Sequence, residues 1–130
     1  MECEETKAMI DETQLPYLTA HQQDCLRRFA WMEVSVEELR TAMTGVFEFE
    51  LQRGHRAAKT WFRMPEPGIA ITRRHLENAL NRKREGKIGE RDLVEWATVL
   101  LLNDAYVLDP GDEDLIAEWL NDISLHLDAS

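Results

Sequence analysis

Few residues in this chain have the types and the spacing that chemistry requires, and His21 and Cys25 are the first candidates. They lie four positions apart in a predicted helix, which would place an imidazole and a thiol on one face for a metal ion. No third ligand follows at a useful spacing, and Cys25 falls on the apolar side of that helix. We therefore interpret Cys25 as a core residue and expect neither a metal site nor a cofactor.

A second candidate is the acidic run that precedes the last predicted helix, because carboxylates gather there as they do in a calcium loop. In Asp109-Pro110-Gly111-Asp112 the glycine stands third, whereas an EF-hand loop requires it at the sixth position. The run instead predicts a helix start, with Asp109 as the N-cap and Pro110 as the first helical residue.

The other titratable residues suggest no catalytic arrangement. His55, His75 and His126 are isolated, and we expect each of them on the surface. Glu48 and Glu50 would share one face of a strand, which is more typical of a solvated face than of paired catalytic carboxylates. The sequence contains no phosphate-binding glycine loop and no nucleophile motif. We therefore predict that the chain is not an enzyme.

Composition limits the class of protein. A chain of 130 residues with 44% hydrophobic residues is expected to form one domain with a substantial core. No apolar run approaches the roughly 18–20 residues of a membrane-spanning helix. The acidic start is not typical of a secretory signal, and only two cysteines occur, so we expect a reducing cytoplasm as the location.

Charge is unevenly distributed along the chain, whose net charge is −10. Residues 53–91 contain eleven Lys or Arg against four acids, whereas residues 103–130 contain eight acids and no Lys or Arg. Residues 1–13 add five acids and one Lys. A strongly negative chain is a poor general binder of nucleic acid and favours a basic protein partner, although solubility alone would explain the charge equally well.

We place the partner-binding surface on the last helix and the turn before it. The residues of this predicted surface are Asp109, Asp112, Glu113, Asp114, Glu118 and Asp122. The apolar stripe of the same helix consists of Leu115, Ile116, Trp119, Leu120 and Ile123.

The elements that must position these residues include one short unit that occurs twice, at an offset of 54 residues. Each copy has the pattern of a helix, a tight turn with one buried aliphatic residue, and a second helix. The matched positions are Leu26 with Leu80, Arg28 with Arg82, Val34 with Ile88, Glu38 with Asp92, and Leu39 with Leu93. Capping boxes are predicted at Thr19 with Gln22 and at Ser35 with Glu38. In the second copy, Thr72 and Gly89 open the two helices.

Between the copies, the segment 46–51 alternates apolar and polar residues as a half-buried strand does. We predict a hairpin that turns at Arg53–Gly54 and returns over 57–62, with Lys59 opposite Glu48 and Trp61 opposite Val46. The proline-rich run 64–68 then separates a helix pair with its hairpin (14–63) from a three-helix unit (69–130). Residues 1–13 are expected to be flexible.

The predicted fold is therefore mostly α, of the α+β class: a helical domain of about five helices, with a small β-hairpin inserted between two helix-turn-helix-like repeats.

The basic segment 73–87 and the helix after it have the outline of a DNA-binding helix-turn-helix. That second helix is apolar almost all round and would bury itself in the centre of the domain. We therefore expect the arginines of 73–87 to pair with the acidic ends of the chain.

The stretch Leu80 to Ala97, together with its earlier twin, resembles small bacterial helical immunity proteins of the colicin D and contact-dependent-inhibition type. The resemblance covers about 20 residues in each copy. It implies an acidic, cytoplasmic, single-domain protein that occludes the basic active site of a nuclease toxin. No individual residue role follows from it.

The hypothesis is a non-enzymatic binding protein, an immunity or inhibitor protein for a basic partner, which is itself a monomer or a homodimer. Two alternatives stay open. One is a structural or assembly protein that forms a homo-oligomer, and the other is a nucleic-acid-binding adaptor that uses the basic helix 73–87.

Overall fold

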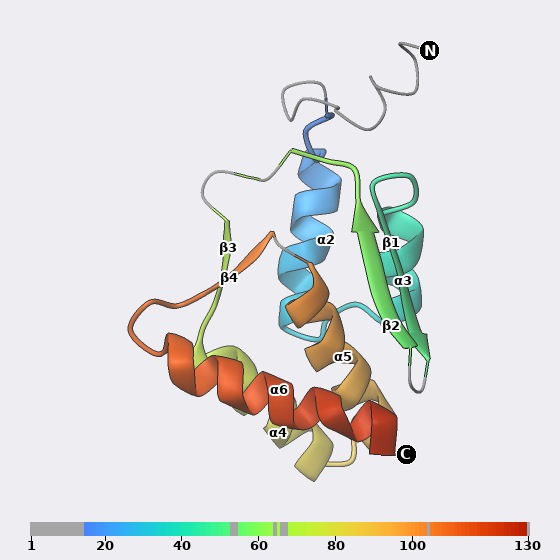
Figure 1. Ribbon diagram of the computed structural model, residues 1–130. Coiled ribbons are helices and arrows are strands. Elements are labelled where there is room, and N and C mark those ends of the chain that lie inside the picture. Colours follow the sequence, from blue (N-terminus) through green and yellow to red (C-terminus); the bar gives the residue numbers. More distant parts are fainter. Residues whose placement is uncertain (1–14, 53–54, 64, 66–67, 104, 130) are drawn as a thin grey trace.

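The computed structural model describes residues 15–52, 55–63, 65, 68–103 and 105–129 (Figure 1). Its helices are α2 (Ala20–Ala30), α3 (Val36–Ala42), α4 (Arg73–Arg84), α5 (Glu90–Leu102) and α6 (Glu113–Ala129). Its strands are β1 (Phe47–Gln52), β2 (His55–Thr60), β3 (Ile69–Ile71) and β4 (Tyr106–Leu108). The predicted α+β class is confirmed, because the part described has five helices and a hairpin between the two helix pairs. The segment 1–13, the turn Arg53–Gly54 and the side chains of His55 and His126 lie outside what is described.

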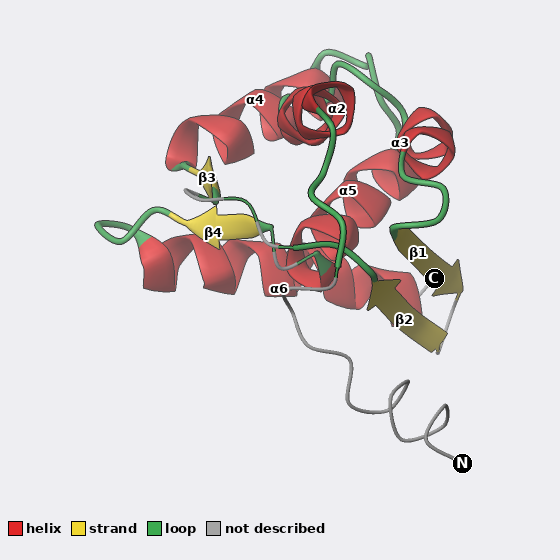
Figure 2. Cartoon of the chain, turned by 90° about the horizontal axis from the view of Figure 1, so that it is seen from above, coloured by secondary structure: helices red, strands yellow, loops and turns green. Residues whose placement is uncertain are grey.

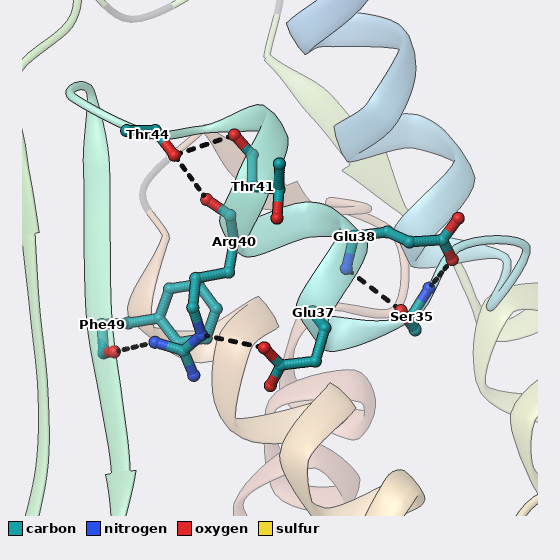
Figure 3. A network of polar contacts seen from close by, with 7 residues as sticks. All are labelled: Ser35, Glu37, Glu38, Arg40, Thr41, Thr44 and Phe49. Atoms are coloured by element: carbon teal, nitrogen blue, oxygen red, sulfur yellow. Dashed lines mark hydrogen bonds and ion pairs between the residues drawn. The ribbon is translucent and has the colours of Figure 1, made fainter.

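The helix starts of the first repeat follow from residues three positions apart. The Gln22 N–H donates to Thr19 Oγ1 and the Thr19 N–H donates to Gln22 Oε1, both at 3.0 Å. The Ser35–Glu38 pair makes the same two bonds, at 3.1 and 2.8 Å (Figure 3). Each reciprocal pair satisfies backbone donors that a helix start leaves free, so both predicted capping boxes are confirmed.

The turn after α2 and the turn after α4, which are equivalent in the repeat, have a left-handed residue and the same hydrogen bond at matching positions. Met32 and Gly86, which are 54 positions apart, have the left-handed φ values of 61° and 78°. The residues that follow them, Glu33 and Lys87, each donate an N–H to the carbonyl five positions earlier, at 2.8 and 2.9 Å. This is the hydrogen bond that ends a helix in a Schellman motif. The Gly89 N–H then donates to Asp92 Oδ2 at 2.9 Å, which matches one half of the Ser35–Glu38 box.

The hairpin has the predicted register. Glu48 is paired with Lys59, and the Trp61 N–H donates to the Val46 carbonyl at 2.7 Å. The return strand spans His55–Thr60, so it begins two residues before the predicted 57–62. Phe47 and Phe49 are buried while Glu48 is exposed, as the alternation of the sequence requires.

The core joins both halves of the chain around α5, which packs against α2, α4, α6 and β1. Trp96 on α5 is buried, and its indole N–H donates to the carbonyls of Phe29 and Ala30 at 3.1 and 3.2 Å. The Tyr106 hydroxyl donates to the Leu26 carbonyl at 2.6 Å, one turn earlier in α2. Side chains from the second half thereby donate to carbonyls in the last two turns of α2, and one buried cluster spans both repeats.

The parallel pair β3–β4 was not predicted from the sequence. Ile69 to Ile71 pair in order with Tyr106 to Leu108, and Figure 2 shows the two strands between α4 and α6. Gly68 precedes β3 in a crowded position, because a Cβ added there would lie 2.8 Å from Val107 Cγ2. A larger residue at position 68 would therefore force the Val107 side chain to shift where β3 approaches β4.

The predicted start of the last helix was wrong. The Asp109 N–H donates to the Ile71 carbonyl at 2.9 Å, which holds Asp109 at the end of the strand pair. A turn closed by the Asp112 N–H on the Asp109 carbonyl follows, at 3.0 Å. The Ile116 N–H then donates to the Asp112 carbonyl, so α6 begins at Glu113 with Asp112 before it. Tertiary pairing of Asp109 thus overrides its preference for an N-cap.

Replacing Trp96 with Phe tests how much the core depends on the indole N–H. We expect the free energy of unfolding to fall by about 2–3 kcal/mol, because two buried carbonyls lose their shared donor and a smaller ring leaves a gap. Chemical denaturation followed by circular dichroism measures the loss. Trp119→Phe is the matched control, since Trp119 is only partly buried. An equal loss in both variants would contradict a special role for the indole donor.

Candidate partner-binding surface

Helix α6 presents a row of carboxylates on its outer side. Asp114, Glu118 and Asp122 are spaced four residues apart, so they lie one above another on the same helical face, and all three are exposed. We call these three residues the acidic stripe. Glu113 is also exposed and lies beside the stripe in the first turn.

The acidic stripe is electrostatically unfavourable for the helix that carries it. Like charges four residues apart destabilise a helix by about 0.2–0.5 kcal/mol for each pair, and the stripe contains two such pairs. The positive end of the helix dipole favours acids only in the first turn, which covers Glu113 and Asp114 but not Asp122. None of the three carboxylates forms an ion pair within the part of the chain that is described.

The opposite side of α6 holds the stripe firmly on the domain. Ile116 and Leu120 are fully buried. The buried hydroxyls of Ser124 and Thr98 lie 2.7 Å apart and hydrogen-bond α6 to α5. One apolar residue, Leu125, remains 55% exposed one turn beyond Asp122. An exposed leucine beside a row of acids adds an apolar contact to a charged surface.

The remaining two residues of the predicted surface lie elsewhere. Asp109 and Asp112 are half-buried and line a shallow groove together with Arg73 and Arg74 at the start of α4. No ion pair joins these acids to the two arginines among the described residues. The structure thus divides the predicted site: the stripe and Glu113 face outward, whereas Asp109 and Asp112 lie beside basic side chains.

Among the described residues, the ion pairs of the basic segment 73–87 are local. Its expected pairing with the acidic ends stays a prediction, because residues 1–14 and the side chains of 126–130 lie outside the described part. Lys83 contacts Glu90 at 3.4 Å and Lys87 contacts Glu85 at 3.3 Å. Helix α4 itself ends at Arg84. The following helix α5 is buried along most of its length, as predicted, so it is not available to enter a DNA groove.

The candidate metal ligands do not come together. Cys25 is buried and its pKa is raised by that burial, which makes its thiolate form unfavourable. His21 is exposed on the same helix. Across the described residues, no group of three His, Cys, Asp or Glu side chains is arranged to hold a metal ion.

His75 is buried rather than on the surface, which corrects the expectation from sequence. Its Nδ1 accepts the Thr72 N–H at 3.0 Å, and its ring stacks on Trp31 with the centroids 3.9 Å apart. Burial lowers the pKa of the His75 imidazole below its ordinary value. The residue therefore acts as a neutral cap for the start of α4, a role that its position three residues after Thr72 would have suggested.

No protein-family model matches this chain, and neither the curated proteins nor the solved structures contain a significant match to it. Among the described helices, none combines the length and the hydrophobicity that a membrane-spanning segment needs. The geometry and charge of the surface are therefore the basis for a functional proposal.

A pH titration tests the role of His75. Because its folded-state pKa is lowered, the unfolded chain binds more protons than the folded chain once the pH falls below about 6.5. The free energy of unfolding should therefore decrease from pH 7 toward pH 5. In His75→Gln, which keeps an acceptor for the Thr72 N–H but does not titrate, this decrease should be smaller. Denaturation curves at several pH values measure it, and equal slopes for the two proteins would contradict the assignment.

Substitution of Glu118 tests the repulsion within the acidic stripe. Glu118→Lys replaces two repulsive pairs with two attractive ones, so we expect the free energy of unfolding to rise by about 1–2 kcal/mol at low salt. Glu118→Gln, which only removes the repulsion, should show about half of this gain. Both gains should shrink in 1 M NaCl because salt screens exposed charges. Loss of stability in both variants would show that Glu118 has a structural role.

Proposed function

We propose that this chain is a non-enzymatic binding protein that uses the acidic stripe of α6, with Glu113 and Leu125 beside it, to bind a basic protein. One observation carries the proposal: the stripe consists of exposed carboxylates without ion-pair partners in the described structure, on a rigid helix that they destabilise. A feature that reduces stability without a compensating internal contact favours a role outside the fold.

The mechanism is steric occlusion assisted by charge. Opposite charges accelerate the diffusional encounter, and the final complex covers the partner's basic surface. The resemblance of residues 80–97 to immunity proteins supports a nuclease toxin as the partner, since the active site of such an enzyme is basic in order to bind phosphate. We place this activity in a reducing cytoplasm, in accord with the buried, unpaired Cys25.

A pull-down with charge-reversed variants tests the proposal. Tagged wild-type chain is incubated with lysate of the source cells, eluted in a salt gradient, and the bound proteins are identified by mass spectrometry. We expect a basic protein that elutes at high salt. It should be absent when Glu118 and Asp122 are both replaced by Lys, because the partner would then meet like charges.

The matched control carries Asp24→Lys and Glu77→Lys, which change the net charge by the same amount at exposed sites on α2 and α4. The control should retain the partner. Loss of the partner from both variants would show that only net charge matters, and retention by both would exclude the acidic stripe. If the captured protein is a nuclease, stoichiometric inhibition of its activity by the wild-type chain completes the test.

A further inference from the structure

The two edges of the hairpin differ in how their backbone groups are satisfied. On the outer edge of β1, Arg40 Nη1 donates to the Phe49 carbonyl at 2.7 Å, and the Arg40 guanidinium lies 4.3 Å from the centre of the Phe49 ring (Figure 3). Arg91 Nη2 donates to the Leu51 carbonyl at 3.3 Å. Two arginine side chains thus occupy carbonyls with which another strand would have to pair.

The outer edge of β2 has no such cover in the described structure. Because the Trp61 N–H donates to the Val46 carbonyl, alternate residues of β2 point their backbone groups toward β1. The residues between them, including Ala58 and Thr60, point their N–H and C=O groups outward. No backbone or side-chain hydrogen bond to these outward groups occurs among the described residues.

We infer that this edge pairs with the same edge of a second copy of the chain, antiparallel and with the two-fold axis at Ala58. The strand β2 spans His55–Thr60, so its outward residues are 56, 58 and 60, with Ala58 at their centre. Pairing about Ala58 aligns residue 56 of each copy with residue 60 of the other. All three outward positions then form ladder hydrogen bonds, and the two hairpins become one four-stranded sheet.

The side chains suit this register. Lys59 of each copy falls opposite Ala57 of the other, so no like charges lie directly across from each other and a small residue leaves room for the long one. Lys59 also faces Glu48 within its own hairpin. Trp61, which is 37% exposed directly after β2, lies at the end of the shared ladder and would be partly covered by it.

Salt should affect this dimer contact in the opposite direction to the proposed binding of a basic partner. Each chain has a net charge of −10, and the two Lys59 residues lie on a diagonal across the axis, so the copies repel each other. Salt screens this repulsion and should strengthen the dimer, whereas it should weaken binding of a basic partner to the acidic stripe. A single strand pair is smaller than the roughly 1,200–2,000 Å² of a standard interface, so we expect a weak dimer.

Sedimentation equilibrium of the full chain tests the inference. We expect a monomer–dimer equilibrium at concentrations of tens to hundreds of micromolar, with a larger dimer fraction at 300 mM than at 20 mM NaCl. Ala58→Pro should weaken dimerisation by about tenfold or more, since it removes the central N–H donor. Its fold should persist, because that N–H does not bond to β1 and proline is tolerated on edge strands.

Hydrogen exchange provides a readout that does not depend on the variant. In the wild-type chain, the amides of Ala58 and Thr60 should exchange rapidly when dilute and become protected as the concentration rises. The amides of Ala57 and Lys59, which face β1, should be protected at both concentrations. A chain that stays monomeric with rapid exchange at Ala58, or a dimer that a folded Ala58→Pro variant leaves unchanged, would overturn the inference. Either result leaves the proposed function of α6 untouched.

Discussion

The hydrogen bond from the Trp96 indole to the end of α2 is the contact on which the arrangement of the two repeats depends. The last carbonyls of a helix have no partner within that helix, and at the buried end of α2 they are also hidden from water. Trp96 is the donor to Ala30 and also bonds Phe29, which accepts the Met32 N–H as well. The Tyr106 hydroxyl adds a bond to Leu26, one turn earlier in α2. A buried carbonyl without a donor is unfavourable, so these bonds select one position of α5 against α2. The hairpin and α6 then pack on α5 in turn.

The turns of the two copies follow the same backbone path, although a different type of residue occupies the left-handed position in each. Both turns need a residue in the left-handed region, where a side chain adds roughly 1–2 kcal/mol of strain. The second copy places Gly86 there, whereas the first places Met32, whose partly buried side chain packs against the core. Packing thus offsets strain in one copy, while the absence of a side chain avoids it in the other. Similar geometry from unlike residues explains why the two copies match at only some positions.

Charge has opposite effects at two regions of the surface. It favours the proposed contact at the acidic stripe and opposes the proposed contact at the hairpin edge. The stripe on α6 concentrates like charges on one helical face, while burial of Ile116 and Leu120 on the opposite face keeps the helix on the domain. At the hairpin, arginines from α3 and α5 cover one strand edge, whereas no described residue hydrogen-bonds to the other. A heterologous partner drawn by charge and a second copy paired through backbone groups would therefore use different surfaces and respond to salt in opposite directions.

Local spacing determined much of the fold. Capping boxes, the alternation of the hairpin and the apolar stripe of α6 depend on residues a few positions apart, so the sequence alone predicted them. The sequence also located the acids of the candidate site. Tertiary structure decided that Asp109 belongs to a strand pair and that His75 is buried under Trp31. It also decided that the stripe and Glu113 face outward while Asp109 and Asp112 do not. Those outcomes depend on which faces of distant elements meet. Periodicity along the chain carries no information about that choice, because the same apolar face can pack against several partners.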